Sequence, residues 1–232
     1  MIKSWSHSRA VEFDKCNLRS KFMIIDRLKE PERTLKEGQT EQANDRGQRL
    51  HEGAELFVKG GVELLPELSD FRPEYEALRT LYSEGRASLE GEWGFNNAWQ
   101  PVGYMSSDCW LRIKLDAMVT IDPTWAVVID YKSGRRSGNE LKHAGQTQLY
   151  TVATLLKYPE LERVTTELWY VDQNELTRVE YTREQGMRFF KVWNDKGIKM
   201  TTATEFLANP NKFSCQWCRF GPKFNGPCKV GV

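Results

Sequence analysis

Asp116 and the triplet Asp130-Tyr131-Lys132 offer the residue types that act on phosphodiesters. Two carboxylates suit a hard divalent cation such as Mg²⁺ or Mn²⁺, which also retains several water ligands. The backbone carbonyl of Tyr131 adds a neutral oxygen ligand. Lys132 cannot bind the cation, but its ammonium can orient or deprotonate an attacking water, or neutralise charge that develops at the phosphorus. Together these groups predict metal-assisted hydrolysis of a phosphodiester.

Two short apolar runs carry these residues. Residues 111–116 and 127–133 are typical of β-strands, and Asp-Pro-Thr at 122–124 supplies a turn between them. Side chains alternate along a strand, so both ends of the triplet share one face. A hairpin of this length brings Asp116 beside them. A lone Asp-x-Lys triplet is equally common in an ordinary surface hairpin, so the elements around it carry the decision.

A predicted helix precedes the hairpin. Residues 44–58 have apolar side chains at helical spacing. His51 and Glu55 are four residues apart and share one face of this helix, so either can serve as a further metal ligand. A partly buried histidine beside an exposed glutamate is the alternative interpretation.

A second predicted helix follows the hairpin, over residues 143–156, and ends before Pro159. Gln146 and Tyr150 are again four residues apart. These two side chains can hydrogen-bond a phosphate or hold the strand that carries the metal site. The spacing fits equally well a helix with a core-facing tyrosine and a solvated glutamine.

The order of these motifs is more specific than any one of them. In chain order they are Gly47-Gln-Arg-Leu-His51, Leu115-Asp116, Asp130-Tyr131-Lys132 and Gln146-Thr-Gln-Leu-Tyr150. This order resembles the PD-(D/E)XK nuclease superfamily, and within it the RecB/AddB nuclease domains and the nucleases of CRISPR adaptation. The resemblance implies an α/β fold, with a central mixed β-sheet flanked by helices as in restriction endonucleases.

The resemblance also implies a role for each motif residue. The expected roles are metal binding for His51, Asp116 and Asp130, catalysis for Lys132, and site support or DNA contact for Gln146 and Tyr150. Glu92 falls where related chains often place an acidic residue on the preceding strand. A carboxylate at the rim is an equally good interpretation of Glu92.

Three of the five cysteines lie close together near the C-terminus, at Cys215, Cys218 and Cys228. A C-x-x-C pair lets two thiolates reach one metal or cluster, and a nearby cysteine supplies a third ligand. No signal peptide opens the sequence, which favours a reducing, intracellular setting and metal ligation over disulfides. Cys109 is expected to be a small buried residue.

The segment around Cys16 resembles the N-terminal segment of related nucleases that carry an iron–sulfur cluster. That resemblance implies a structural [4Fe-4S] cluster that joins residues 1–30 to residues 205–232. Its four ligands are expected to be Cys16, Cys215, Cys218 and Cys228. Zn²⁺ held by the same four thiolates is the alternative, because a four-cysteine site suits both.

Composition fits one compact enzyme. A chain of 232 residues matches a single α/β nuclease domain, with residues 44–158 as its expected catalytic core. With 33 Lys and Arg against 32 Asp and Glu, the net charge is only +1, so DNA binding must use local basic patches. Arg135 and Arg136, just after the second strand, are the best candidates. No apolar run approaches membrane-spanning length, and the expected location is the cytoplasm, that of the host if a phage encodes the chain.

The remaining segments are expected to support this core. The sequence predicts a helix over residues 1–30, a loop over 31–45, helix over 62–87 broken around Pro66 and Pro73, a hairpin of 164–171 and 177–181, and a helix from 183 to about 203.

The sequence therefore predicts a metal-dependent deoxyribonuclease, and the resemblance implies an exonuclease that acts on DNA with free or single-stranded ends. Recombination, repair or phage DNA processing is the expected setting, with a recombination or replication protein as a possible partner. A structure-specific endonuclease and a non-catalytic DNA-binding subunit are the alternatives. The intact Asp130-Tyr131-Lys132 triplet argues against the second alternative.

Overall fold

The computed structural model describes residues 1–31, 35 and 38–231. The chain divides into two compact units. One consists of Met1–Lys36 together with Val192–Val232, and the other is Glu37–Lys191. The expected catalytic core, residues 44–158, lies within the second unit, and the expected cluster segments lie in the first.

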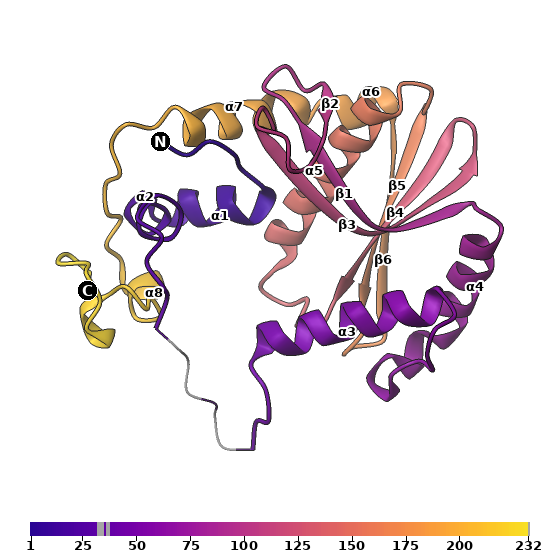
Figure 1. Ribbon diagram of the computed structural model, residues 1–232, viewed down its shortest axis with the longest axis horizontal. Coiled ribbons are helices and arrows are strands. Elements are labelled where there is room, and N and C mark those ends of the chain that lie inside the picture. The colour runs from indigo at the N-terminus through magenta and orange to yellow at the C-terminus, as the bar shows by residue number, and fades with distance from the viewer. Residues whose placement is uncertain (32–34, 36–37, 232) are drawn as a thin grey trace. The chain divides into compact units, whose positions relative to one another are not determined.

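The unit Glu37–Lys191 is built on a mixed sheet, which has six strands among the described residues (Figure 1). Its strand order is β2-β1-β3-β4-β5-β6. The strands are β1 (Ala87–Phe95), β2 (Pro101–Val102), β3 (Leu111–Asp122), β4 (Trp125–Lys132), β5 (Arg163–Tyr170) and β6 (Glu175–Thr182). Helices flank the sheet, so the expected α/β class with a mixed central sheet is confirmed.

Only β4 and β5 pair in parallel, and the other neighbouring strands pair antiparallel. Parallel neighbours need a crossover, and α5 (Glu140–Lys157) supplies it. Consequently α5 starts beside the end of β4 that carries Asp130 and Lys132. The topology thus brings the motif of this helix to the motif of the strand.

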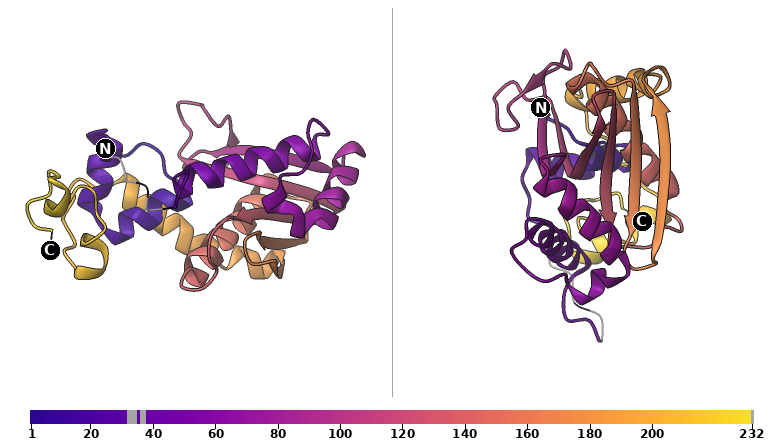
Figure 2. Two further views of the ribbon diagram at one scale, coloured as in Figure 1. Left: turned by 90° about the horizontal axis from the view of Figure 1, so that it is seen from below. Right: turned by 90° about the vertical axis from the view of Figure 1, so that its right-hand side faces the viewer.

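Helices cover both faces of the sheet, as the left panel of Figure 2 shows. The helices α3 (Ala43–Val58) and α4 (Arg72–Ser83) lie on one side, and α5 lies on the other. The core beneath α3 and α4 is aromatic: the ring of Tyr75 lies 5.3 Å from that of Tyr131 and 5.2 Å from that of Trp169. Burial of such large rings, together with the aliphatic side chains of the same core, holds the two helices on the sheet.

The unit of the two chain ends is helical. It contains α1 (His7–Lys15), α2 (Asn17–Ser20), a π-helical turn (Lys21–Ile25), α7 (Phe190–Thr201) from Val192 onwards, α8 (Lys212–Cys215) and a 3₁₀ turn (Pro222–Phe224). Trp5 stacks on Trp193 with ring centroids 6.4 Å apart, and Asp14 pairs with Lys196. These contacts join the N-terminal helix to α7 within this unit.

The predicted continuous helix over residues 1–30 is wrong. Residues before His7 and after Ile25 are not helical, and Cys16 interrupts the helix with extended backbone at φ −163° and ψ 110°. Ser6 caps the first segment, where its hydroxyl accepts from the N–H of Arg9. The spacing of apolar residues does not predict that interruption, because both segments keep helical periodicity.

The predicted helix over residues 62–87 is also too long. A 3₁₀ turn spans Pro66–Phe71, α4 ends at Ser83, and β1 has begun by Ala87. Residues 183–203 likewise form two helices, α6 (Arg183–Met187) and α7, instead of one. The prediction of a loop over 31–45 falls partly outside the described residues, and α3 begins at Ala43.

The predicted hairpins and motif helices are confirmed. Strands β3 and β4 pair antiparallel around the turn at residues 123–124, and β5 and β6 form the second hairpin. Within the described residues, no helix has both the length and the apolar composition needed to cross a bilayer.

Candidate active site

The site begins where β3 and β4 stop pairing. Their ladder ends at Ala117 and Ile129, and beyond it the carboxylate of Asp116 replaces a backbone acceptor. Its Oδ2 accepts the N–H of Tyr131 at 2.6 Å. Tyr131 packs its side chain into the core and also contributes to the lining of the cleft described below. The divergence of the two strands therefore fixes Asp116 against the end of β4.

The α3 helix brings His51 to Asp116. Gly47, one turn earlier, lies so close to β4 that a Cβ there would be 3.2 Å from the hydroxyl oxygen of Ser133. This close approach places His51 Nδ1 2.8 Å from Asp116 Oδ1. Burial lowers the pKa of His51, but the hydrogen bond to Asp116 and nearby carboxylates outweigh burial and raise its pKa above the usual value.

The surroundings of Asp116 disfavour the charged form of its carboxyl. Burial raises the pKa of its carboxyl, and the charge of Asp130 raises it further, whereas His51 and the N–H of Tyr131 oppose that rise. Two buried carboxylates that repel one another need a cation between them or a shared proton. The chemistry of this pair therefore fits a divalent metal.

Lys132, Asp130 and Gln146 form a closed set of contacts. Lys132 Nζ lies 2.5 Å from Asp130 Oδ2 and donates to Gln146 Oε1 at 2.8 Å. The amide nitrogen of Gln146 donates to Asp130 Oδ1 at 2.9 Å. A single glutamine thus fixes the ammonium and the carboxylate relative to one another.

Tyr150 ties this set to β3. Its hydroxyl donates to the backbone carbonyl of Lys114 at 2.8 Å and contacts the amide nitrogen of Gln146 at 2.7 Å. Gln146 and Tyr150 therefore act on the same face of α5, as their spacing predicted, and both point toward the carboxylates. Gln146 is partly exposed and Tyr150 is buried.

Glu90 of β1 joins the group, which the sequence reading missed. Leu89 pairs with Ala117 and Gly91 with Leu115, so Glu90 lies opposite Asp116 on the neighbouring strand. One ligand atom each from His51, Glu90 and Asp116 lies within 4.8 Å of the others. The backbone of Glu90 has φ +48°, a left-handed conformation that costs a non-glycine residue and that recurs at functional sites.

Glu92 and Glu55 do not reach the carboxylates. Glu92 is exposed, and neither residue lines the cleft. Glu55 instead pairs with Lys59, 2.5 Å away, along α3. The sequence alone could have identified Glu90 only with the register of β1 against β3, which no local pattern specifies.

An open cleft of about 880 Å³ unites these residues. It is lined by His51, Glu90, Asp116, Asp130, Lys132, Gln146 and Tyr150, together with neighbours from α3, α5 and the segment after β4. Its volume and its polar lining suit a charged, extended ligand rather than a small apolar one.

The expected basic contacts divide into two kinds. Arg135 lines the cleft, whereas Arg136 lies outside it and pairs with Glu175 at 3.2 Å. Arg46 and Arg49 of α3 are engaged as well, by Asp172 and by Glu41 and Glu67. Arg135 is therefore the better candidate of the predicted pair for a phosphate contact.

The four expected cluster cysteines line one cavity in the unit of the chain ends. Burial raises the pKa of Cys218, and the thiols of Cys16 and Cys228 add to that rise. In the described residues no three thiols lie within 4.8 Å of one another. Cys109 is buried in the other unit, where its thiol donates to the carbonyl of Leu111 at 3.4 Å.

Comparison with known proteins identifies the class. The chain belongs to the PD-(D/E)XK nuclease superfamily, whose family model matches residues 4–222. The predicted superfamily is therefore confirmed. Its members are metal-dependent nucleases. The chain is similar to the crystal structure of SSO0001, with 15% sequence identity and a TM-score of 0.48 over 100% of this chain and 88% of that chain. No curated protein matches this chain.

Proposed function

We propose that this protein is a divalent-metal-dependent exonuclease that hydrolyses DNA from its ends, in recombination, repair or phage DNA processing. One observation carries the proposal of catalysis: Lys132 lies 2.5 Å from Asp130 in the same open cleft as Asp116 and His51. A nuclease-family domain that only bound DNA would have no need to keep this lysine beside the carboxylates.

The proposed metal ligands come from four elements, α3, β1, β3 and β4. They are His51, Asp116, Asp130 and the backbone carbonyl of Tyr131, as the family resemblance implies, with Glu90 added from its position beside Asp116. Oxygen-rich ligand sets favour Mg²⁺ or Mn²⁺. When bound, such a cation supplies Lewis-acid stabilisation and an acidic water.

Three residues of the cleft have separate roles in this proposal. Lys132 holds its ammonium next to the carboxylate of Asp130, where it can orient the attacking water or stabilise negative charge on the phosphoryl oxygens. Gln146 restrains that ammonium through its side-chain oxygen. Arg135 contributes charge at the cleft for a backbone phosphate.

A nuclease assay tests the proposal. Wild-type protein is compared with Lys132→Ala and with Lys59→Ala, which alters an exposed lysine that follows α3 and lies outside the cleft. Substrates are end-labelled linear DNA, single- and double-stranded, and closed circular DNA, with Mn²⁺ or with chelator. We expect progressive loss of the labelled linear DNA, abolished by chelator and by Lys132→Ala and retained by Lys59→Ala.

Three other outcomes would contradict the proposal. Cleavage of the closed circle identifies an endonuclease. Binding of linear DNA without cleavage by the folded wild-type protein, with either cation, overturns catalysis in favour of a DNA-binding subunit. Activity that persists in Lys132→Ala at the wild-type rate overturns the assigned site.

We further propose that Cys16, Cys215, Cys218 and Cys228 hold a structural [4Fe-4S] cluster. All four cysteines line one cavity, which supports a common ligand for them. A four-cysteine site suits both a cluster and Zn²⁺, so metal analysis distinguishes the two. Anaerobically purified protein should contain iron and absorb broadly in the visible. Cys228→Ala should lose both, whereas Cys109→Ala should keep both; colourless protein with stoichiometric zinc would reject the cluster.

A further inference from the structure

Charge is distributed unevenly along this chain. Residues 206–232 contain four basic residues and neither Asp nor Glu, although the whole chain has 33 Lys and Arg against 32 Asp and Glu. The rest of the chain is therefore net acidic. The basic residues of this segment are Lys212, Arg219, Lys223 and Lys229.

Large aromatic side chains lie on the surface of the same segment. The exposed fraction is 87% for Phe213 and 70% for Trp217. The ammonium of Lys223 lies 5.8 Å from the centroid of the Trp217 ring, and the guanidinium of Arg219 lies 4.3 Å from that of Phe224. Basic groups are thus interspersed with three aromatic rings, those of Phe213, Trp217 and Phe224, along one short stretch of chain.

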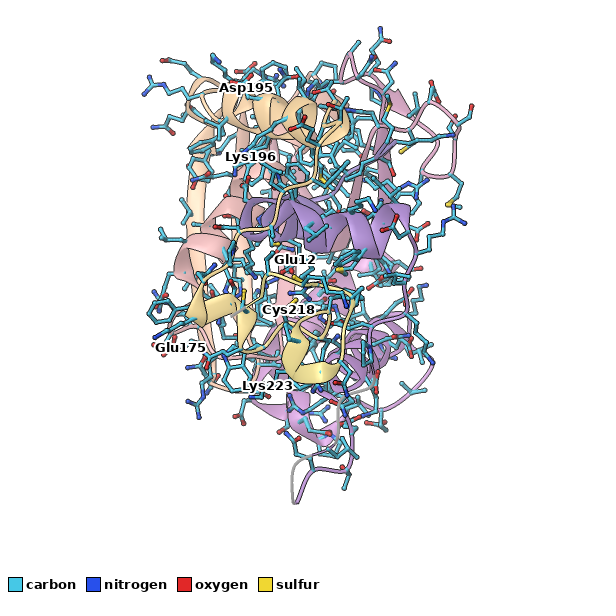
Figure 3. The ribbon with its side chains drawn as sticks, turned by 90° about the vertical axis from the view of Figure 1, so that its left-hand side faces the viewer. Glu12, Glu175, Asp195, Lys196, Cys218 and Lys223 are labelled. Atoms are coloured by element: carbon cyan, nitrogen blue, oxygen red, sulfur yellow. The ribbon has the colours of Figure 1, made fainter. Side chains whose placement is uncertain are left out.

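These aromatics are held by ordered backbone. Asn211 caps α8 by accepting the N–H of Ser214 at 2.9 Å, and the N–H of Cys228 donates to the carbonyl of Phe220 at 2.9 Å. Phe220 itself is buried. Gly226 packs against its backbone so tightly that a Cβ on residue 226 would lie 2.2 Å from the carbonyl carbon of Phe220. Lys223 and Cys218 lie on this same segment, coloured yellow in Figure 3.

Two alternatives do not fit this surface well. A core role is excluded for Phe213 and Trp217 by their exposure. An apolar protein partner would not call for a segment without any acidic residue. Basic grooves with exposed aromatic rings are the usual means of binding single strands, because every unpaired base offers a face for stacking. Stacked duplex DNA hides those faces.

We propose that Lys212, Phe213, Trp217, Arg219 and Lys223 form a basic–aromatic surface that binds single-stranded DNA. This inference rests on the proposed function, since it names the form of DNA that the nuclease engages. The surface is distinct from the carboxylate site, which lies in the other unit.

Fluorescence anisotropy of a labelled oligothymidylate tests the surface. Wild-type protein is measured in chelator, which prevents cleavage, beside Phe213→Leu, Trp217→Leu and Trp217→Phe. The control is Leu207→Ala, which alters an exposed apolar residue of the same unit at 70% exposure. We expect each leucine variant to weaken binding about tenfold, Trp217→Phe to restore most of the affinity, and the control to bind as wild type.

Salt dependence tests the basic part separately. Lys223→Gln should reduce the slope of log affinity against log salt by about 0.7, the value for one phosphate contact on a single strand. Wild-type affinity for both leucine variants, or equal affinity of wild type for blunt duplex of the same length, would overturn the surface. Because Trp217 lies between two thiols, iron content is measured in each variant, and Phe213→Leu and Lys223→Gln decide the outcome if Trp217→Leu loses iron.

The binding and nuclease assays fail independently. Trp217-dependent binding without any nuclease activity would support the surface and reject the proposed function. Nuclease activity with wild-type affinity in Phe213→Leu, Trp217→Leu and Lys223→Gln would support the function and reject the surface.

Discussion

Lys114 Nζ lies 2.7 Å from a carboxylate oxygen of Glu90, so the glutamate that lies beside His51 and Asp116 forms an ion pair. The hydrogen bond to Glu90 is the largest cause of the raised pKa of Lys114. The side chain of Lys114 is 57% exposed, whereas that of Glu90 is 19% exposed. An ion pair with so exposed a lysine is weak, so it leaves the Glu90 carboxylate available to a divalent cation.

This relationship predicts that Glu90 contributes to metal affinity. Glu90→Gln removes the charge and keeps the shape, so we expect Mn²⁺ to bind about tenfold more weakly, because a ligating carboxylate is lost. Titration of free Mn²⁺ by electron paramagnetic resonance measures this directly. Glu92→Gln, two residues along the same strand but exposed, should bind as wild type. Equal affinity of the two variants would remove Glu90 from the ligand set.

Gln146 is predicted to act by positioning Lys132. Gln146→Leu removes the two contacts that join Lys132 to Asp130 through the amide, so we expect kcat to fall by about tenfold to a hundredfold. The KM for DNA should change little, because the amide contacts the ammonium and the carboxylate, whereas a general loss of structure would change kcat and KM together. Gln148→Leu, on the same helix but outside the cleft, is the control.

Two tyrosines give opposite predictions for stability. The hydroxyl of Tyr75 is buried with no hydrogen-bond partner among the described residues, and burial raises its pKa far above the usual value. Tyr75→Phe should therefore raise the free energy of unfolding by about 1 kcal/mol. The hydroxyl of Tyr170 contacts His143 Nδ1 at 2.9 Å, so Tyr170→Phe should lower it by about 1 kcal/mol. Urea denaturation measures both, and a loss of stability in Tyr75→Phe would contradict the first.

Much of the site was predictable because its motifs are local. Period-two and helical patterns identified β3, β4, α3 and α5, and the alternation of side chains placed Asp130 and Lys132 on one face. The i,i+4 spacing of Gln146 and Tyr150 likewise put both on the face that meets the strand. These relations need no knowledge of the tertiary fold.

The remainder depends on relations between distant elements. The position of Glu90 follows from the register of β1 on β3, and a shift by one residue would have presented its neighbours instead. The break at Cys16 is a backbone conformation within a segment that keeps helical periodicity on both sides. The pairing of Arg136 with Glu175 depends on where β6 begins, so the sequence could not show that this arginine is already engaged.

The last prediction concerns His143, which lines the cleft beside Lys132 without belonging to the proposed ligand set. Burial and the charges of Lys132 and Lys142 lower its pKa from 6.5 to about 4, against the opposing charges of Asp130 and Glu140. The unfolded chain takes up a proton at this histidine below pH about 6.5, whereas the folded protein does not until pH about 4. Stability from this group is therefore complete above pH 6.5 and declines as the pH falls toward 4.

His143→Gln removes this titration. Between pH 7 and pH 4.5, wild-type protein should lose about 1–2 kcal/mol more of its free energy of unfolding than the variant does. Urea denaturation at the two pH values gives the difference, and acid effects from other groups cancel because both proteins share them. His143→Phe serves as a second non-titrating variant and should match His143→Gln in its pH dependence, whatever its stability at pH 7. An equal loss in wild type and both variants would mean that His143 titrates normally in the folded protein.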